Sequence, residues 1–425
     1  MIKIVSDNIC FNEIFSRTTD KLDIEKSVQE IILAVKNNGD SAIKYYTEKF
    51  DKVKLDNLLV SDEEIKQAVS KVDKKFLSIL QKSAENIRLY HQAQKRSGFE
   101  ITNNDGAIVG QKIIPIERVG LYVPGGTAAY PSTVLMDSIP AKIAGCDQVV
   151  MVTPPDKNGN INPVILAAAF VAGVDKIYKV GGAQAIAGLA YGTETLPKVD
   201  KIVGPGNAFV AEAKKQVFGI VSIDMIAGPS EILIVADNKN NPSYIATDLL
   251  SQAEHDKMAS AVLITDDIDF ANAVSNELEI QIPKLSRSEI ARSSIDNNGK
   301  IIVTKDINSA IEVANKLAPE HLELCLDNPF TYLEKIKHAG SVFLGRNCPE
   351  AMGDYIAGAN HTLPTSGTAR FSSALSVDDF IKKTQYIYYD EKALKNSAFD
   401  VEYFAKQEGL TAHAQSAVCR VKDDE

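Results

Sequence analysis

The middle of the chain alternates short runs of β-branched residues with glycine-rich turns and helices of small residues. The runs occupy 119–123, 148–153, 176–180 and 201–203. Each run is followed by a turn and a small-residue helix, and this repeated β-turn-α pattern predicts a parallel sheet. Ligands of such sheets bind at the carboxyl ends of the strands, so we expect these turns to face a ligand.

A second series of strands follows residues 227–230. The expected strands are 232–236, 261–265, 301–304 and 342–344. A helix over 244–254 is predicted between the first two strands, because Asn241 can cap it and Pro242 suits its first turn. After Ser376 the sequence becomes charged, and we predict a helical tail.

The N-terminal part of the chain is charged and is predicted to be helical. Apolar periodicity over 22–38 predicts a helix that ends at Gly39. Ser61 and Glu64 match a capping box, and the pattern after them predicts one long helix towards Gln94. We interpret this region as scaffold.

The chain is acidic, with 46 basic and 56 acidic residues among 425 and a formal net charge of −10. An acidic surface repels phosphate backbones, so no nucleic-acid partner is expected. No apolar run reaches the ~18–20 residues that span a bilayer, so no membrane partner is expected, and the start of the chain lacks a signal-peptide core. The five cysteines contain no C-x-x-C pair. Reduced thiols and the missing leader predict a cytoplasmic protein that starts near Met1.

Two segments place a histidine beside an acid or an amide. Gln252 and His255 lie three residues apart on one predicted helix face, and they offer an amide oxygen and an imidazole nitrogen to Zn²⁺ or Mn²⁺. Glu320 and His321 follow a proline and form a suitable general-base pair, because both side chains can be tuned towards neutral pH. Taken singly, the first segment is more typical of a polar helix end on the surface, and the second is more typical of a solvated loop.

Two further segments show the same pairing. Asp354 and His361 lie in GDYIAGANH (353–361), where small residues allow a loop to fold closely around a ligand. Glu408 and His413 lie in the tail. Alone, the first segment is also typical of a flexible turn, and the second of an exposed helix end.

Together the four segments favour a metal-binding active site over four coincidences. Of the six histidines, only His91 and His338 lie elsewhere. A mixed nitrogen and oxygen ligand set is typical of a divalent metal with open positions for substrate. The turns at 181–182 and 204–206 are a separate signal, since they place backbone N–H groups where a phosphate can bind. The G-x-G-x-x-G fingerprint is absent, so simple tight turns remain an equal interpretation.

Longer motifs resemble the histidinol dehydrogenase family. They are GLYVPGG (120–126), GGAQAIA (181–187), GPGN (204–207), the stretch 223–231 that leads on to QAEH (252–255), APEHLEL (318–324) and the run 353–371. The resemblance covers essentially the whole chain from about residue 20. One departure is Asp256, where the family pattern has glycine. The extra charge beside the predicted metal helix is expected to alter metal affinity, not the identity of the enzyme.

The resemblance implies that L-histidinol is oxidised to L-histidine through L-histidinaldehyde in two NAD-dependent steps, the last reaction of histidine biosynthesis. It implies Zn²⁺ with the ligands Gln252, His255, Asp354 and His413. It implies Glu320 and His321 as the catalytic acid–base pair. The implied NAD contacts are Tyr122, Gln184 and Asn207. The implied substrate contacts are Ser230, Gln252, His255, His321, Asp354, His361, Glu408 and His413.

The expected fold class is α/β, with two incomplete Rossmann-like domains of parallel sheets, a helical N-terminal part and a small C-terminal tail domain. The expected division is an N-terminal segment (1–20), a discontinuous α/β domain with the metal and catalytic residues (21–120 and 231–375), an NAD-binding domain (121–230) and the tail domain (376–425). The resemblance also implies a homodimer with shared active sites. The tail would reach the partner subunit, so that His413 and Glu408 serve the other site.

Other functions fit parts of the sequence. A relative could oxidise a different small diol or amino alcohol. A metallohydrolase with a Glu320-activated water would leave the turns at 181–184 and 204–207 without a role. A non-catalytic metal-binding relative is expected to lack Glu320 and His321, which are present. A covalent route through Cys146 or Cys348 is not expected, because Cys146 has the sequence context of a core residue.

Overall fold

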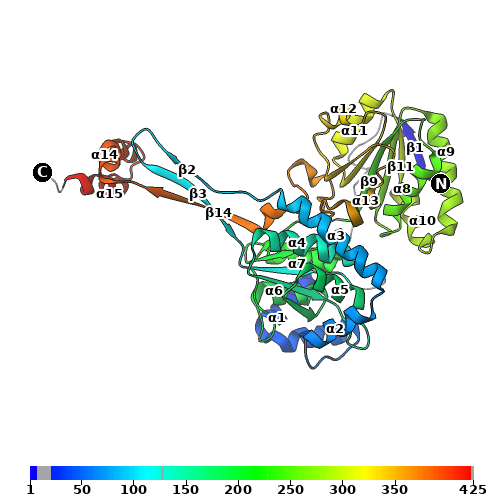
Figure 1. The fold of residues 1–425 in the computed structure, drawn as a ribbon, viewed down its shortest axis with the longest axis horizontal. Helices are drawn as coiled ribbons and strands as arrows, with labels where there is room; N and C mark the ends of the chain where they lie inside the picture. The colour runs from blue at the N-terminus through cyan, green and yellow to red at the C-terminus, as the bar shows by residue number, and fades with distance from the viewer. Residues whose placement is uncertain (7–20, 126–128, 227, 423–425) are drawn as a thin grey trace. The chain divides into compact units, whose positions relative to one another are not determined.

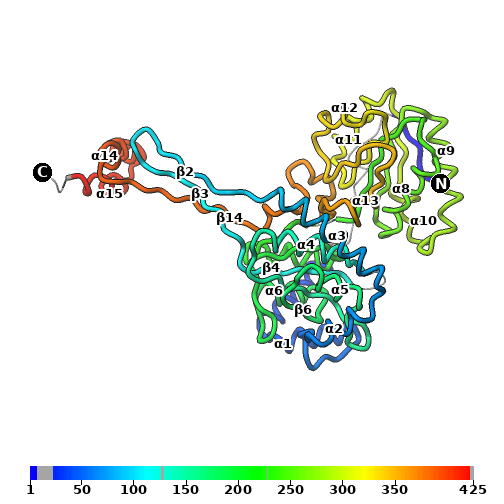
Figure 2. Tube along the Cα trace, viewed as in Figure 1, coloured from blue at the N-terminus to red at the C-terminus, as the bar shows by residue number. Residues whose placement is uncertain are grey.

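The computed structural model describes residues 1–6, 21–125, 129–226 and 228–422, so most of the expected N-terminal segment 1–20 lies outside the described residues. Contacts along the chain divide it into two units. The first unit comprises Met1–Gln94 and Glu117–Phe380, and the second comprises Lys95–Ile116 and Ile381–Glu425. Figures 1 and 2 trace the chain through both units.

The first unit contains a five-stranded parallel sheet in the order β6-β5-β4-β7-β8. Its strands are β4 (Arg118–Tyr122), β5 (Gln148–Thr153), β6 (Lys176–Lys179), β7 (Lys201–Val203) and β8 (Ser222–Ile223). The helices that follow its strands are α4 (Pro131–Ala144), α5 (Pro163–Ala172), α6 (Gly182–Tyr191) and α7 (Ala208–Val217). The four strands predicted from β-branched runs are confirmed to within one residue at either end.

The same unit contains a six-stranded parallel sheet in the order β1-β11-β10-β9-β12-β13. Its strands are β1 (Lys3–Ser6), β9 (Glu231–Ala236), β10 (Ser260–Thr265), β11 (Lys300–Val303), β12 (His321–Cys325) and β13 (Ser341–Leu344). The helices of this part are α8 (Pro242–Ala253), α9 (Ile268–Gln281), α10 (Ser288–Asn297), α11 (Ile307–Leu317) and the short α12 (Phe330–Leu333). As predicted, Asn241 caps α8 and Pro242 opens it.

Both faces of this six-stranded sheet are buried, which explains the continuous apolar sequence of its strands. In β9, Ile232 and Ile234 point into a core formed with α8, α9 and α10. The alternate residues Leu233 and Val235 point into a second core formed with α11. Because successive strand residues face opposite sides, one short strand serves both cores.

Helix α1 (Lys21–Asp51) is kinked at Gly39, whose φ is 51°. The helix predicted over 22–38 therefore ends where expected, but a second helical segment follows it. Apolar residues of α1 such as Val28 and Ile43 pack into the core of the five-stranded sheet. Helix α1 buries its apolar face against α6 and α7 of this sheet. The expected grouping of 21–120 with 231–375 stays a prediction.

The single helix predicted from Ser61 towards Gln94 is wrong, because two helices occupy this region. Helix α2 (Asp62–Lys71) begins with the predicted capping box of Ser61 and Glu64. Helix α3 (Lys74–Gln92) begins anew at Asp73, whose side chain accepts a hydrogen bond from the N–H of Phe76 at 3.0 Å. The carboxylate of Asp73 competes with helix continuation by capping the next segment.

The second unit contains an antiparallel sheet in the order β14-β3-β2 and two helices. Its elements are β2 (Phe99–Thr102), β3 (Ile108–Pro115), β14 (Ile381–Tyr388), α14 (Glu391–Gln407) and α15 (Thr411–Lys422). The predicted tail helices are confirmed, but β14 was not predicted, since its partner β3 lies far away in the sequence. Among the described helices, none combines the length and apolar character required to cross a membrane.

Candidate active site

His321 is the first residue of β12, at the amino end of the six-stranded sheet, and its side chain is buried. Its Nδ1 lies 2.9 Å from the carbonyl oxygen of Glu231. A carbonyl only accepts hydrogen bonds, so Nδ1 carries the proton and donates it. In the neutral ring Nε2 is then unprotonated, and it has no hydrogen-bond partner among the described residues. This nitrogen is ready to accept a proton.

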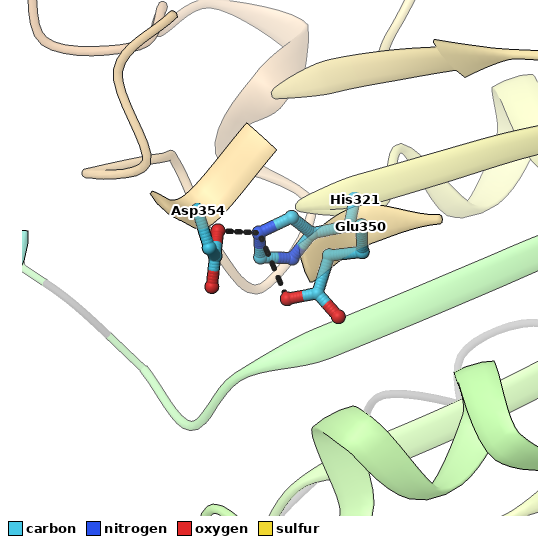
Figure 3. A group of neighbouring side chains, drawn as sticks. All are labelled: His321, Glu350 and Asp354. Carbon is cyan, nitrogen blue, oxygen red and sulfur yellow. Dashed lines mark ion pairs between the residues drawn. The ribbon is translucent and has the colours of Figure 1, made fainter. Parts of the chain in front are cut away.

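Two carboxylates face this nitrogen (Figure 3). Glu350 Oε1 lies 3.8 Å and Asp354 Oδ1 lies 3.9 Å from His321 Nε2. Glu350 belongs to the short helix α13 (Glu350–Met352), and Asp354 to the π-helix η3 (Gly353–Ala357) that continues it. The ligand atoms of the three residues lie within 4.8 Å of one another, a spacing that can hold a metal ion.

Glu320 lies against the other ring nitrogen. Its Oε2 accepts a hydrogen bond from the N–H of Glu231 at 2.8 Å and lies 3.6 Å from His321 Nδ1. Burial raises the pKa of Glu320 well above its usual value, and the negative charges of Glu231, Glu350 and Asp354 add to this effect. A carboxylate with a raised pKa takes a proton from water more readily.

Gln252 lies in the last turn of α8 and is only 1% exposed. Its Nε2 donates to Glu350 Oε1 at 3.0 Å and lies 3.1 Å from His321 Nδ1. Because His321 Nδ1 donates to Glu231, the second approach is a contact between two donors. Gln252 Oε1 is buried and has no hydrogen-bond partner among the described residues.

His255 and His361 complete the surroundings of the cluster. Burial lowers the pKa of His255, and the nearby charges of Glu350 and His321 act on it in opposite directions. His361 Nδ1 lies 3.9 Å from Asp354 Oδ1. Burial, followed by the charges of His321 and His255, lowers the pKa of His361 to about 4. Both imidazoles are therefore neutral at pH 7, the form that binds metals or substrate protons.

The pKa of Asp354 is shifted upward, whereas the pKa values of the two histidines are shifted downward. Burial, followed by the charge and hydrogen bond of Glu350, raises the pKa of Asp354 to about 8. The π-helix that presents it is held by α3, because Ser83 Oγ donates to the carbonyl of Tyr355 at 2.6 Å and Asn86 Nδ2 donates to that of Ile356 at 2.7 Å.

Helix α4 holds the segment that carries His361. Asn360 Nδ2 donates to the carbonyl of Met136 at 2.6 Å, and Thr362 Oγ1 donates to Asp137 Oδ1 at 2.6 Å. Asp137 is 1% exposed, and burial raises its pKa to about 7. The sequence analysis missed Asp137 and Glu350, because neither lies beside a histidine. Glu350 could have been suspected as a site residue only because it precedes Asp354 by four residues.

Three expected substrate residues remain to be placed: Ser230, Glu408 and His413. Ser230 directly precedes β9, and its carbonyl accepts a hydrogen bond from the N–H of Ser260 at 3.0 Å. Glu408 and His413 belong to the second unit, where both are exposed at the end of α14 and in α15. Their expected service to a partner's active site stays a prediction.

The expected dinucleotide residues lie at the carboxyl ends of the five-stranded sheet. Tyr122 ends β4, and its hydroxyl accepts a hydrogen bond from the N–H of Gly182 at 3.1 Å. Gln184 in α6 is 1% exposed, and its Oε1 has no partner within the described part of the chain. Asn207 is exposed and caps α7 with its side-chain oxygen.

A buried ion pair braces the turn between β7 and α7. Lys214 and Asp224 form the pair. Lys214 Nζ donates to the carbonyl of Gly204 at 2.9 Å, and Asp224 Oδ2 accepts from the N–H of Gly204 at 2.8 Å. Gly204 has φ +110°, and a Cβ there would lie 2.1 Å from the carbonyl oxygen of Tyr122. The close approach of this turn to β4 therefore requires glycine.

A pocket of about 580 Å³ opens at the carboxyl ends of β4 and β5 and is bordered by residues of α2 and α5. Prolines 124, 154 and 155 and the side chains of Ile165 and Leu166 line its apolar part. Polar and charged side chains line the rest of it: Glu64, Gln67, Lys71, Asp156, Asn160 and Asn162. A concave site with both apolar walls and several polar or charged groups suits a polar small molecule.

Two further residues were singled out from the sequence. Asp256 is exposed, and its Oδ1 accepts from the N–H of Met258 at 2.8 Å, so the carboxylate closes the turn before β10. Its effect on metal affinity stays a prediction. Cys146 is buried, as its sequence context predicted, and its thiol donates to the carbonyl of Phe380 at 3.8 Å. No cysteine within the described residues forms a disulfide.

Comparisons with known proteins agree with this architecture. The sequence profile of the histidinol dehydrogenase family matches residues 15–421. Histidinol dehydrogenase from Clostridium acetobutylicum is 56% identical over 403 residues, which cover 95% of this chain and 94% of that protein. The Streptococcus mutans enzyme of the same name is 54% identical over 413 residues, 97% of this chain and 96% of that protein.

A solved structure gives the same result. The crystal structure of histidinol dehydrogenase from Elizabethkingia anophelis aligns with a TM-score of 0.94 at 40% identity, and the alignment covers 99% of this chain and 98% of that one. The α/β fold class expected from the sequence is confirmed. The chain belongs to the histidinol dehydrogenase family.

Proposed function

We propose that this chain oxidises L-histidinol to L-histidine through L-histidinaldehyde in two NAD-dependent steps, as the last reaction of histidine biosynthesis. The family membership supports this activity. The observation that carries it is the unprotonated, buried Nε2 of His321, which lies among Glu350, Asp354 and Gln252. Oxidation of an alcohol by hydride loss requires a base that accepts the hydroxyl proton, and Nε2 of His321 can do this. The surrounding side chains can bind a cation that positions the alcohol.

The residues at the cluster fit a divalent cation, for which we propose Zn²⁺. Gln252 Oε1 is a buried oxygen that has no partner within the described ranges, and such an atom is costly unless a ligand satisfies it. The pKa of Asp354 is raised to about 8, so the cluster holds its negative charges poorly without a positive one. We propose Gln252, His255, Asp354 and His413 of a second subunit as the ligands, a mixed set suited to an open zinc site.

The turns of the five-stranded sheet fit NAD. Gly182 begins α6 and Asn207 caps α7, so two helix N-termini lie at the sheet's carboxyl edge and suit a pyrophosphate. The buried Oε1 of Gln184, unpartnered among the described residues, suits a ligand donor. Tyr122 lies between the two turns, and the adjoining pocket has room for more of the cofactor.

The first oxidation uses His321. When bound, the cation would hold histidinol through the lone pairs of its amine and imidazole nitrogens, and the nicotinamide would supply the hydride acceptor. His321 Nε2 takes the hydroxyl proton while the carbon loses hydride. The resulting imidazolium keeps its Nδ1–H on the carbonyl of Glu231, with Glu320 at 3.6 Å to stabilise its charge.

The second oxidation uses Glu320. The buried carboxylate, with its raised pKa, takes a proton from water as the water oxygen attacks the aldehyde carbon. The His321 imidazolium returns its proton to the aldehyde oxygen, which completes the hydrate and leaves Nε2 free to accept a proton again. The hydrate then loses a second hydride to another NAD⁺, and its hydroxyl proton goes to His321. Enclosure of the reacting groups keeps the reactive aminoaldehyde from side reactions.

We propose a homodimer that shares its active sites. Apolar side chains of the second unit are exposed in the single chain: Phe99 (56%), Ile101 (55%), Ile387 (66%), Phe399 (56%), Tyr403 (70%) and Phe404 (68%). Exposed apolar patches of this kind mark interaction surfaces. Glu408 and His413 lie in the same unit, so a subunit that covers this surface can receive them.

The test is a stoichiometry count. Purified protein is incubated with limiting histidinol and excess NAD⁺, and the reduced nicotinamide is followed by absorbance. We expect two NADH for each histidinol, loss of the reaction after chelation and recovery with Zn²⁺. Equal rates with simple diols would favour a relative of different substrate. No nicotinamide signal would refute the proposal and favour a hydrolase.

A further inference from the structure

The Glu350 carboxylate is the feature of the cluster that neither the acid–base steps nor the ligand set uses. We propose that Glu350 is a positioning residue: it holds the side-chain amide of Gln252 so that the oxygen, and not the nitrogen, is presented to the cation. This inference rests on the metal of the proposed function and adds the means by which one of its ligands is oriented.

Glu350 is itself firmly held. It is 3% exposed, and its N–H donates to Glu323 Oε1 at 2.7 Å. Its Oε2 accepts from Ser251 Oγ at 2.9 Å, and its Oε1 accepts from Gln252 Nε2 at 3.0 Å. Both carboxylate oxygens are thus engaged by neighbouring residues at the end of α8. A side chain fixed at both oxygens can fix its partner.

The orientation of Gln252 needs such a partner because an amide has two ends of similar shape. Only the oxygen end can bind a cation, since the nitrogen end has no free electron pair. A carboxylate accepts hydrogen bonds and cannot donate them, so the nitrogen of Gln252 must face Glu350. The oxygen is then left without a partner among the described residues, as the structure has it.

His321 opposes this orientation. Its Nδ1–H lies 3.1 Å from the Gln252 nitrogen, and it would form a hydrogen bond with the amide oxygen if the amide turned over. The turned amide would place its nitrogen where the oxygen now lies. Glu350 prevents this exchange, because a turned amide would bring two oxygens to about 3.0 Å from each other without a proton between them.

The inference predicts a specific order among variants. Glu350→Leu removes both acceptors at nearly unchanged volume and should weaken zinc affinity by about 10–100-fold, the usual effect of losing a partner that orients a ligand. Glu350→Gln retains an acceptor oxygen for the Gln252 amide and should keep most of the affinity. A direct ligand or a purely electrostatic role predicts instead that Gln is as harmful as Leu.

The experiment measures zinc binding by the full-length apo-protein, in competition with a chromogenic chelator, so that its readout is independent of turnover. Each Glu350 variant is made in the wild-type and the Gln252→Ala backgrounds. If Glu350 acts through Gln252, Glu350→Leu causes a clearly smaller loss once Gln252 is alanine, because only its interaction with Asp354 then remains to be lost. Glu212→Leu, a change on α7 at a partly buried carboxylate that pairs with Lys215, is the matched control.

Each outcome decides the matter. Additive losses in the two backgrounds, equal losses for Gln and Leu, or unchanged affinity in Glu350→Leu would overturn the inference while leaving the proposed zinc site intact. A wild-type protein that binds no zinc would instead refute the metal of the proposed function, and the inference with it. If Glu350→Leu does not fold, Ser251→Ala releases one oxygen of Glu350 and should weaken zinc binding only where Gln252 is present.

Discussion

Asp137 allows a quantitative test, because this residue of α4 has a buried carboxyl whose pKa is far from normal. Burial raises the pKa of Asp137 from 3.8 to about 7; Asp224 adds to the shift, whereas Thr362 and Lys214 oppose it. Its Oδ2 has no hydrogen-bond partner within the described residues. The native protein therefore prefers the protonated acid, which asparagine imitates at every pH. We predict that Asp137→Asn stabilises the protein at alkaline pH.

The sign follows from proton linkage. Between pH 4 and pH 7 the native state keeps a proton on Asp137 that the unfolded chain has lost, so wild-type stability falls as pH rises through this window. The shift from 3.8 to about 7 corresponds to roughly 4 kcal/mol above pH 7. About half of that, roughly 2 kcal/mol, develops between pH 5.5 and pH 8.5.

Urea unfolding followed by circular dichroism measures the effect. We expect the stability advantage of Asp137→Asn over the wild type to grow by roughly 2 kcal/mol from pH 5.5 to pH 8.5. Ionisation of other groups cancels in this difference. Thr362→Val, which removes the donor to Asp137 Oδ1, should lower stability instead. An advantage that stays constant with pH would show that Asp137 is ionised in the native state, and the reasoning would fail.

Four other changes test separate parts of the structure. His413→Asn should weaken zinc binding and slow turnover while the KM for NAD⁺ stays unchanged; equal effects on both would indicate a structural role. Glu320→Gln should slow oxidation of the aldehyde more than that of the alcohol, in single-turnover assays with each substrate, and equal slowing would contradict its assignment to water. Ser61→Ala should reduce the free energy of unfolding by about 1 kcal/mol, because it removes the capping box; an unchanged urea midpoint would argue against that cap. Gly204→Ala should reduce the free energy of unfolding by about 1–3 kcal/mol or more. Gly204 has a positive φ, and the added Cβ would collide with the carbonyl oxygen of Tyr122. A Gly204→Ala protein of wild-type stability would mean that the turn can relax.

Features set by neighbouring residues were predictable from the sequence. The cap of α8 at Asn241 and the capping box at Ser61 depend on hydrogen bonds within one helical turn, so a short pattern reveals them. The β-branched runs before glycine turns gave the strands of the five-stranded sheet, because both faces of such strands are buried and their apolar residues are continuous.

Features set by distant residues were not predictable in this way. Strand β14 pairs with β3 across the sequence from Ile381 to Pro115, and its exposed residues carry no apolar alternation. Glu350 meets Gln252 over 98 positions. Only the family resemblance assigned Gln252 and Asp354 to the same metal site. Helix spacing predicts which residues within one turn lie together, but it does not predict which distant loops meet in space.

The π-helix η3 has a consequence for how this active site can be lost. A π-turn accommodates an additional residue relative to an α-helical turn, and here α3 holds its carbonyls through Ser83 and Asn86. Deletion of a single residue between Asp354 and Ala357 would let η3 rewind as an α-helix and rotate the chain that follows it by about 100° relative to Asp354. Every proposed metal ligand would still be present in the gene product, yet the proposed catalytic geometry would be gone. A relative with an intact set of motif residues but a shortened GDYIAGANH segment would thus be a pseudoenzyme that residue inspection alone cannot recognise.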